Sequence, residues 1–306
     1  MFNEAYIIQA ITLYHSFRKY NKTSVFIFAC LSDKTRKIIS SLKLNNILII
    51  TIEQLDQKII KKIKKNRPLE QFYWTLKSIF FNFILNNNND INYLIYLDSD
   101  MFFLNSIDDY ITANKKYDVI LTPHNFSKSF MEVNKNYNVF GKFNAGCLIF
   151  KCTKNSKLIL SWWMKKCIAD CSVNYLKGKL GDQKYLDIIY KKQKNILCSE
   201  NIGLNLGPWN FENFNLKTDK CILFHYQGLK IINYRVYNLY SGKIIIRKIY
   251  YEFFYKSYLY SLKKSIENLV KYQLINDLKN IYSPTHILRE FKKFLLKQSN
   301  LKILIK

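Results

Sequence analysis

Two aspartates follow directly after an apolar segment near the middle of the first 200 residues. Residues 93–97 read YLIYL and lead into Asp98, Ser99 and Asp100. The apolar run predicts a buried β-strand, and side chains two positions apart on an extended chain point the same way. Two carboxylates at the end of a strand can hold Mg²⁺ or Mn²⁺, which commonly share such ligands with substrate phosphates. An ordinary turn at a strand end is the alternative.

A histidine, a glycine and a lysine follow a second strand-like segment. Residues 224–230 read FHYQGLK and come after the run CILF. Neutral imidazole at His225 can complete a metal shell. Gly228 allows the backbone to approach an anion, and Lys230 supplies a positive charge for phosphate. A purely structural histidine is the alternative.

Two further segments combine small or flexible residues with polar side chains. In FNAGCLIF, Asn144 and Gly146 precede an expected strand, where a flexible turn can approach a ligand. In GKLGDQKYLD, Asp182 and Gln183 stand at the start of an expected amphipathic helix and can bring a carboxylate and an amide to a substrate hydroxyl. The alternatives are a strand-entry turn in the first segment and a helix N-cap in the second, since Asp is favoured at N-caps.

Strands and helices must alternate along the chain to position these side chains. Residues 4–20 have apolar residues at helical spacing, and residues 24–31 and 46–52 are short apolar runs. Helix and strand in this order favour an α/β fold with a mainly parallel sheet flanked by helices. Further helices are expected at 33–42, where Ser32 can cap the first turn, and at 55–66, 70–85, 156–170 and 181–192, with further strands at 118–122 and 146–151.

The composition changes after about residue 240. Residues 241–306 contain 14 basic and 4 acidic residues and include two basic segments with aromatic faces, at 250–272 and 286–297, which we expect to be helical. Such helices can bind an anionic membrane surface, or they can close the preceding domain with their lysines in solvent. We therefore expect one domain over residues 1–240 and a helical extension over residues 241–306.

Length and composition exclude several classes of protein. The chain has 306 residues, and 49% of them are hydrophobic, enough to bury a sizeable core and to exclude a wholly disordered chain. With 8 Gly and 4 Pro it is not collagen-like or proline-rich. No signal peptide and no membrane-spanning helix are expected. The seven scattered cysteines lack paired CxxC spacing, which favours reduced, buried thiols in a cytosolic protein.

The net charge of +26 has two explanations. A strongly basic chain can bind nucleic acid or an anionic membrane. The chain also has only 6 Ala and 8 Gly, a skew expected from A+T-rich codons, so much of the lysine excess can be compositional. Because lysines are spread along the whole chain and no helix-turn-helix, RRM or zinc module is recognisable, we expect no specific nucleic-acid partner. A basic nucleic-acid-binding protein remains the less favoured alternative.

Taken in order, these motifs resemble those of bacterial glycosyltransferases of the GT-A fold, in the nucleotide-diphospho-sugar transferase superfamily related to glycosyltransferase family 8. The resemblance extends over residues 3–230, and its specificity lies in the ordered set of motifs. The matching segments are NEAYIIQAITLYHSF at 3–17, EQFYWTLKSIFF at 70–81, YLIYLDSDMFFLNSIDDY at 93–110, TPHNF at 122–126, FNAGCLIF at 143–150, WWMKKCIADC at 162–171, GKLGDQKYLD at 178–187, GLNLGPWNFENF at 203–214 and FHYQGLK at 224–230.

The resemblance implies a nucleoside-diphosphate sugar as donor, with a UDP-sugar the first expectation, and Mn²⁺ or Mg²⁺ on the diphosphate. Asp98 and Asp100 match the DxD motif of these enzymes, and His225 matches the histidine that completes their metal site. The remaining matches place Ser99, Gly228 and Lys230 near the diphosphate, Asn144 and Gly146 along the sugar pocket, Asp182 and Gln183 beside the reacting sugar, and His124 on the acceptor side.

The resemblance also implies an acceptor and a location. The acceptor is expected to be a glycan or glycolipid in bacterial surface polysaccharide synthesis. The location is expected to be the cytoplasm, with the inner face of the plasma membrane as a further possibility through residues 241–306. A non-catalytic relative that binds a glycan or acts as a scaffold is the alternative.

The sequence departs from the resembled pattern at two places. Related enzymes begin with a β-strand before the first helix, whereas Met1 lies almost at that helix here, so we expect the strand to be missing or the natural chain to be longer. The residues after Lys230 lack the Pro-Trp pair that follows this lysine in family 8 itself. The second departure predicts a relative of family 8 and not a member.

Overall fold

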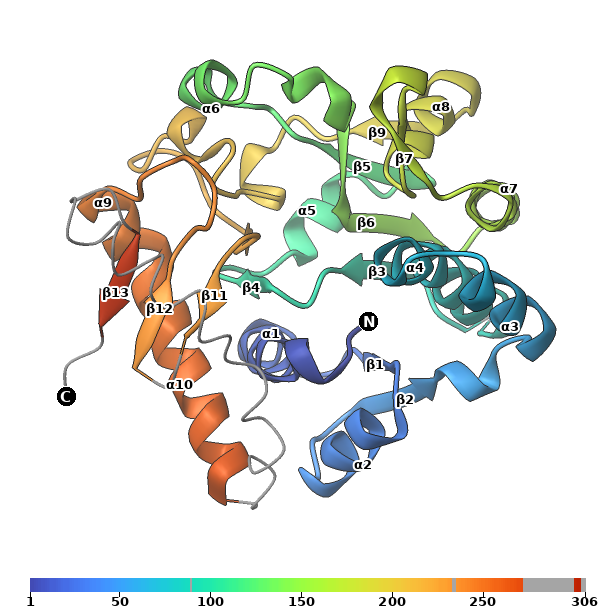
Figure 1. The fold of residues 1–306 in the computed structure, drawn as a ribbon, viewed down its shortest axis with the longest axis horizontal. Helices are drawn as coiled ribbons and strands as arrows, with labels where there is room; N and C mark the ends of the chain where they lie inside the picture. The colour runs from blue at the N-terminus through green and yellow to red at the C-terminus, as the bar shows by residue number, and fades with distance from the viewer. Residues whose placement is uncertain (89, 233–234, 272–299, 304–306) are drawn as a thin grey trace.

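The computed structural model describes the chain except for residues 89, 233–234, 272–299 and 304–306 (Figure 1). It is an α/β fold in which several short sheets are surrounded by helices. The long helices bear out the sequence-based expectations closely, because their apolar residues follow the helical repeat. The first of them is α1 (Ile7–Tyr20), preceded by the short turn η1 (Glu4–Tyr6).

The N-terminal part forms a parallel βαβ unit. Strands β1 (Phe26–Cys30) and β2 (Ile47–Thr51) pair in parallel and are connected by α2 (Asp33–Ser41). The side chain of Ser32 accepts a hydrogen bond from the backbone N–H of Thr35 and caps α2, as expected. Both strands and the helix were predicted from the sequence.

A single residue pairs with β1 ahead of the first helix, where related enzymes are expected to have a strand. Phe2 forms a parallel bridge with Cys30, so the N-terminal residues extend the sheet of β1 and β2 by one position. The backbone oxygen of Met1 accepts a hydrogen bond of 3.0 Å from the Ser99 hydroxyl. The N-terminus therefore connects the βαβ unit to the turn after β3, near the centre of the molecule (Figure 1).

The central sheet is mixed. Its order is β3 (Tyr93–Leu97), β6 (Phe143–Lys151), β5 (Val119–Pro123) and β9 (Ile196–Cys198). β6 lies antiparallel to both β3 and β5, and only β5 and β9 run parallel. The expectation of a mainly parallel sheet was therefore wrong. The central position of β6 decides this, because alternating helices and strands do not fix the direction of a strand inserted between two others.

Two long helices cover one side of the central sheet. α4 (Leu69–Asn87) and α7 (Lys154–Ala169) pack against each other and share a hydrophobic core with β5 and β6 (Figure 1). The other elements of the first 231 residues are η2 (Ile52–Gln54), α3 (Gln57–Lys65), β4 (Met101–Phe103), α5 (Asp108–Ala113), α6 (Lys128–Val133), η3 (Tyr137–Phe140), β7 (Val173–Asn174), η4 (Tyr175–Lys177), β8 (Lys179–Leu180), α8 (Lys184–Lys192), η5 (Ile202–Leu204), η6 (Phe211–Asn213), β10 (Leu223–His225) and β11 (Lys230–Ile231).

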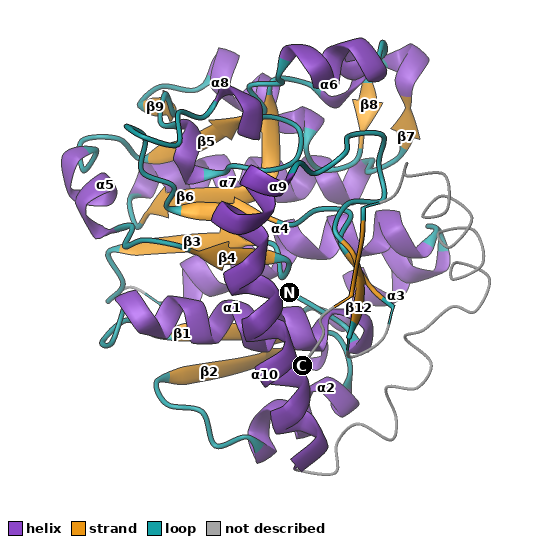
Figure 2. Cartoon of the chain, turned by 90° about the vertical axis from the view of Figure 1, so that its left-hand side faces the viewer, coloured by secondary structure: helices purple, strands orange, loops and turns teal. Residues whose placement is uncertain are grey.

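The C-terminal helices pack on α1. The Thr12 and Ser265 hydroxyls lie 2.8 Å apart, and the Tyr226 hydroxyl donates a 2.6 Å hydrogen bond to the backbone oxygen of Phe254. Figure 2 shows α10 running across α1. The elements of this part are β12 (Val236–Asn238), α9 (Lys248–Tyr250), the π-helical turn η7 (Tyr251–Tyr255), α10 (Lys256–Lys271) and β13 (Leu301–Ile303).

The two basic segments of the C-terminal part have different outcomes. The helix expected at 250–272 is present as far as Lys271, whereas the helix expected at 286–297 lies outside the described residues. The boundary expected at residue 240 stays a prediction. Of the helices in the described ranges, none has the length and apolar character needed to cross a bilayer.

Candidate active site

Pairing between β4 and β10 brings three possible metal ligands together. The chain turns after β3 at Asp98 and Asp100, and β4 begins at Met101. β10 runs antiparallel to β4 with His225 opposite Met101. As a result, His225 Nε2 lies 3.2 Å from Asp100 Oδ1 and 3.9 Å from Asp98 Oδ2. The ligand atoms of these three residues all lie within 4.8 Å of one another.

The three side chains suit a divalent cation. Carboxylate oxygens together with a neutral imidazole are ligands that Mn²⁺ accepts readily and Mg²⁺ accepts in part. His225 is held with Nε2 toward the carboxylates, and its buried Nδ1 has no hydrogen-bond partner among the described residues. Gly146 packs against the ring so closely that a Cβ at this position would lie 2.5 Å from His225 Cε1. Glycine at 146 is therefore a requirement for the position of His225.

A buried lysine of α4 lies next to the metal-ligand group. Lys77 Nζ is 3.0 Å from Asp182 Oδ2 and 3.7 Å from Asp98 Oδ1, and it donates a 3.2 Å hydrogen bond to the backbone oxygen of Ala145. Its side chain is only 7% exposed. Lys77 thus ties together α4, the end of β3, β6 and the loop before α8.

Burial and charge act against each other on these groups. Burial lowers the pKa of Lys77, but the carboxylates of Asp182 and Asp98 outweigh it, and the pKa is raised. Burial raises the pKa of Asp98, but Lys77 and His225 outweigh it, and the pKa is lowered. For Asp182 burial prevails over the attraction of Lys77, and the pKa is raised. Burial lowers the pKa of His225, but Asp100 and then Asp98 outweigh it, and the pKa is raised. The carboxylates therefore favour positive charge at both Lys77 and His225.

A bulge in β6 places Asn144 and Gly146 in the site. The pairing of β6 with β5 shifts in register between Leu121 and Thr122, which leaves residues 145–147 without partners on β5. Asn144 and Gly146 consequently lie inside a strand, and the expected turn ahead of a strand at 146–151 was wrong. A turn was expected because its irregular backbone could approach a ligand. The bulge supplies an irregular backbone within the strand.

Hydrogen bonds fix the bulge on both sides. Asn144 Oδ1 accepts 2.8 Å and 3.1 Å hydrogen bonds from the Gly146 N–H and from Asn205 Nδ2. The Gly146 carbonyl accepts a 2.8 Å hydrogen bond from the Asp98 N–H. The bulge is therefore connected directly to the first aspartate of the metal-ligand group.

Asp182 and Gln183 lie beside the bulge, ahead of α8. Gln183 Oε1 accepts a 3.1 Å hydrogen bond from the Ala145 N–H, and its Nε2 donates a 2.9 Å hydrogen bond to the Phe140 carbonyl. Asp182 is paired with Lys77. Gln183 occupies the N-cap position of α8, but neither side chain caps the helix, so the alternative of a simple helix cap was wrong.

His124 lies behind Asn144 and does not line the cleft. Its Nδ1 is 3.1 Å from the Gly141 carbonyl, and its Nε2 is 3.5 Å from Asn144 Nδ2. Nδ1 can therefore donate to the carbonyl while Nε2 accepts from the amide, which requires a neutral ring. Burial lowers the pKa of His124 to about 4 and keeps the ring neutral at pH 7. His124 was expected on the acceptor side of the site, but it is buried and does not line the cleft. It supports the bulge from the core instead.

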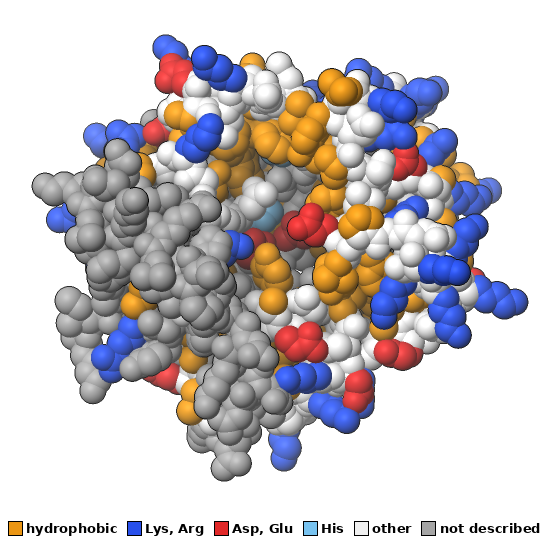
Figure 3. All heavy atoms as spheres, viewed as in Figure 1, with side chains coloured by type: hydrophobic (Ala, Val, Ile, Leu, Met, Phe, Trp, Pro, Cys, Tyr) orange, Lys and Arg blue, Asp and Glu red, His pale blue; other side chains and the backbone are white. Residues whose placement is uncertain are grey.

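An open cleft of about 970 Å³ has the metal-ligand group at its bottom. Its bottom is also lined by Lys77, Asn144, Gly146, Asp182 and Gln183. Figure 3 shows the hollow near the centre of one face, with acidic side chains and a histidine at its bottom and hydrophobic side chains around its rim. Ser99 lines the cleft, although its hydroxyl is bonded to Met1. Gly228 and Lys230 are not among the lining residues, so their contact with a diphosphate stays a prediction.

Residues 1–231 match the sequence model of the family described as glycosyl transferase family 8. The match covers most of the chain and includes every element that builds the cleft. The chain belongs to glycosyl transferase family 8. The missing Pro-Trp pair after Lys230 had predicted a relative outside the family, and the match overturns that prediction, because it depends on the whole ordered sequence and not on one dipeptide.

Relatives of this family 8 enzyme agree in sequence and in fold. It is 25% identical to the uncharacterized protein YfnF of Bacillus subtilis (strain 168) over 242 residues, which cover 74% of this chain and 79% of YfnF. The galactosyltransferase LgtC, solved with donor and acceptor sugar analogs, superposes with a TM-score of 0.53 at 12% identity, covering 86% of this chain and 94% of LgtC. The glycosyltransferase GlyE of Streptococcus pneumoniae TIGR4 gives a TM-score of 0.52 at 14% identity, covering 89% of this chain and 62% of GlyE. The expected GT-A fold is confirmed.

The sequence-based interpretation missed two groups of this family 8 site. Lys77 had a detectable signal, because it is the lone charged residue between Gln71 and Leu85 in an otherwise largely apolar helix. Asn205 joins Asn144 to the Thr122 hydroxyl through hydrogen bonds of 3.1 Å and 2.9 Å. Nothing in its local sequence distinguishes Asn205 from a loop asparagine.

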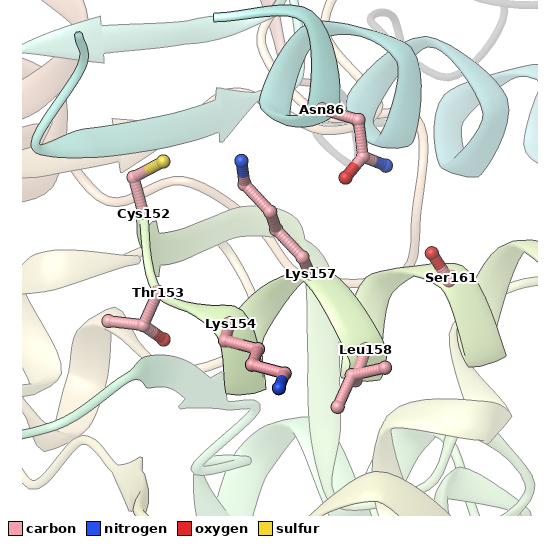
Figure 4. Close-up of a pocket in the computed structure, with 7 residues that line it drawn as sticks. All are labelled: Asn86, Cys152, Thr153, Lys154, Lys157, Leu158 and Ser161. Carbon is pink, nitrogen blue, oxygen red and sulfur yellow. The ribbon is translucent and has the colours of Figure 1, made fainter. Parts of the chain in front are cut away.

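A second hollow, of about 450 Å³, lies between the end of α4 and the start of α7. Figure 4 shows Asn86 on one side and Lys154, Lys157 and Ser161 on the other. No carboxylate or imidazole is among the described residues that line it. The described residues that line this hollow therefore hold no group of carboxylates and imidazole like that of the cleft.

Proposed function

We propose that this glycosyltransferase moves a sugar from a nucleoside-diphosphate donor, in the first place a UDP-sugar, to a glycan or glycolipid acceptor with the help of Mn²⁺ or Mg²⁺. The convergence of Asp98, Asp100 and His225 at the bottom of the cleft carries the proposal. A divalent cation held by these residues would stabilise the negative charge that grows on the leaving diphosphate.

The donor sugar is assigned to the part of the cleft lined by Asn144, Asp182 and Gln183. Asn144 and Gln183 each accept a backbone N–H of the bulge through their oxygen, so both amides are fixed before substrate binds. Asp182 has carboxylate oxygens that can accept hydrogen bonds from sugar hydroxyls. Lys77 lies within ion-pair distance of both Asp182 and Asp98 and favours their charged forms.

The nucleoside is assigned to the end of the cleft next to the N-terminus. Tyr6 lines the cleft there, and 42% of it is exposed. Burial, with smaller effects from Asp100 and Asp98, raises the pKa of its hydroxyl to about 12, and both carboxylates line the same cleft. An exposed aromatic ring offers a stacking surface for a base. Phe2 and Asn3 line the same end of the cleft.

Calorimetric titration of UDP with and without Mn²⁺ tests the proposal. Wild type should bind UDP in a Mn²⁺-dependent manner, and Asp100→Ala should lose most of this binding, at least about 100-fold. Asp109→Ala is the matched control, because the Asp109 carboxylate is 93% exposed and lies 3.9 Å from Lys220, outside the cleft. If folded wild-type protein binds neither UDP nor another nucleoside diphosphate with Mn²⁺ or Mg²⁺, the non-catalytic alternative is favoured.

The proposed role in bacterial surface polysaccharide synthesis is supported by the resemblance and by one surface feature. Ile249, Phe253 and Tyr260 on the C-terminal helices are exposed, and the exposed Lys256 lies among them in the sequence. We propose peripheral contact of this surface with anionic lipid, where a glycolipid acceptor would be found. Co-sedimentation with phosphatidylglycerol vesicles, but not with phosphatidylcholine vesicles, is expected. It should weaken in Phe253→Ser, and equal binding to both vesicles would argue against the proposal.

A further inference from the structure

The outer part of the cleft differs in chemistry from its bottom. Two aromatic residues of α4, Tyr73 and Trp74, line it on one side. The hairpin formed by β7, η4 and β8 lines it with Val173, Tyr175 and Leu180. We call these five residues the outer wall. Unlike the bottom of the cleft, the outer wall contains no charged side chain.

The outer wall is held in place where the hairpin meets α4. Gly181 has φ of +50°, and a Cβ at this position would lie 2.6 Å from the Trp74 ring. The hairpin base therefore packs directly on Trp74. The Gly181 N–H donates a 3.1 Å hydrogen bond to the Ser172 carbonyl, and Lys179 forms an ion pair with Asp170. The ring of Trp74 is thus positioned by contacts within the protein.

The outer wall begins one helical turn away from the buried ion pair. Trp74 precedes Lys77 by three residues on α4, so both lie on the same face, about 4.5 Å apart along the helix axis. On the opposite side, Gly181 directly precedes Asp182, the partner of Lys77. A molecule bound on the outer wall would therefore lie next to a donor sugar that contacts Asp182.

Exposure within the hairpin differs between neighbouring residues. Tyr175 lines the cleft with 54% of its surface exposed. Leu176, the next residue, is fully exposed and does not line the cleft.

Glu70 and Gln71 of α4 also line the cleft and add a carboxylate and an amide at the edge of the aromatic surface. Aromatic rings with hydrogen-bonding groups at their edge suit a molecule that has an apolar face and polar rims.

We propose that the outer wall binds a sugar residue of the acceptor glycan, with its C–H face stacked on Trp74 and Tyr175 and its hydroxyls directed toward Glu70 and Gln71. The inference rests on the proposed function, because it places the acceptor next to a donor sugar at Asp182. A pyranose ring has the required chemistry, with an apolar face and a hydroxylated rim. The diphosphate does not, since it is charged and the outer wall has no charged side chain, whereas the metal-ligand group lies at the bottom of the cleft.

Binding of glycans to protein loaded with UDP and Mn²⁺ tests this inference. The probe is a printed panel of mono- and oligosaccharides, followed by titration of each saccharide that binds. Tyr175→Ala and Trp74→Ala should each weaken saccharide binding about tenfold or more. Trp74→Phe should retain most of it, because an aromatic ring is kept. Leu176→Ala should behave as wild type, because Leu176 belongs to the same hairpin but not to the outer wall.

UDP titration of the same proteins separates the two proposals. All five proteins should bind UDP with equal Mn²⁺-dependent affinity, which also shows that the variants are folded. If wild type binds UDP but no saccharide of the panel, or if Tyr175→Ala and Trp74→Ala bind saccharides as wild type does, the outer wall is not the acceptor site. If wild type binds neither UDP nor another nucleoside diphosphate with Mn²⁺ or Mg²⁺, the proposed function itself fails.

Discussion

The cleft has a charged bottom and an apolar outer wall, and the two are built in different ways. The bottom consists of Lys77, Asp98, Asp100, Asp182 and His225, each of which lies within ion-pair distance of another. The outer wall is mostly carried by a short hairpin that has only a few hydrogen bonds. Buried charges tolerate little change, because any group left without its partner carries a large desolvation cost. An exposed aromatic surface can change its sequence at much lower cost.

Removal of Lys77 should show the largest effect on stability. Lys77→Met leaves Asp182 and Asp98 without their shared cation, so we expect the free energy of unfolding to fall by about 3–5 kcal/mol. Urea denaturation measures this change. Lys37→Met is the control, because the 2.8 Å ion pair of Lys37 with Asp33 is solvent-exposed and should contribute little to stability.

A double variant sharpens the prediction for Lys77. Lys77→Met combined with Asp182→Asn removes one of the two stranded carboxylates, and part of the lost stability should return. If Lys77→Met unfolds at the same urea concentration as Lys37→Met, the bottom of the cleft is not held by charge pairing, and its contrast with the outer wall disappears.

The stability should also depend on pH through His124. Its pKa is lowered from 6.5 to about 4 by burial, so the unfolded chain binds a proton at His124 before the folded protein does. The free energy of unfolding keeps this contribution in full above pH 6.5. It falls by about 3 kcal/mol as the pH falls toward 4. We expect His124→Phe to lose less stability than wild type between pH 7 and pH 4, as measured by urea denaturation across that range. Parallel loss in both proteins would contradict the prediction.

Two glycines allow a more local comparison of the bottom and the hairpin. In Gly146→Ala the new Cβ would lie 2.5 Å from His225 Cε1, so the imidazole must move and Mn²⁺-dependent UDP binding should weaken about 10- to 100-fold. In Gly178→Ala the new Cβ meets no atom within 4 Å, although φ is +62°. This variant should lose about 1–2 kcal/mol of stability and keep its UDP affinity.

Equal loss of UDP affinity in both glycine variants would contradict this prediction. It would show that the hairpin and the bottom of the cleft respond as one unit. Calorimetric titration and urea denaturation of the same two preparations separate the effects on binding and on folding.

Much of the fold could be predicted because local patterns carry it. The apolar repeat of α1 and α4, the cap at Ser32 and the strand before Asp98 were all found from the sequence. The direction of β6 was not found, because β6 is buried on both faces, and such a continuous apolar run does not tell which way its neighbours run. The bulge at Asn144 and Gly146 was taken for a turn, because the same small and polar residues suit both.

Part of the candidate site could also be predicted, because local patterns mark some of its residues. Asp98, Asp100 and His225 were grouped from their positions at strand ends and from the resemblance, and the structure brings them within 4.8 Å of one another. Lys77 was missed because a lysine in a helix is usually at the surface, although its lone charge in a largely apolar helix was a signal of its burial among carboxylates. His124 was expected at the acceptor side, although its neighbours place it in the core behind Asn144.

The sequence by itself determined the α/β class, the DxD motif at the end of a strand and the membership in a family of glycosyltransferases, because these depend on residue types and their order along the chain. The tertiary structure decided which charges meet. Ion pairs act over a few ångströms, and the residues concerned come from α4, β3, β10 and the loop before α8. No local pattern records such distances, since they arise only when the strands pair and the helices pack.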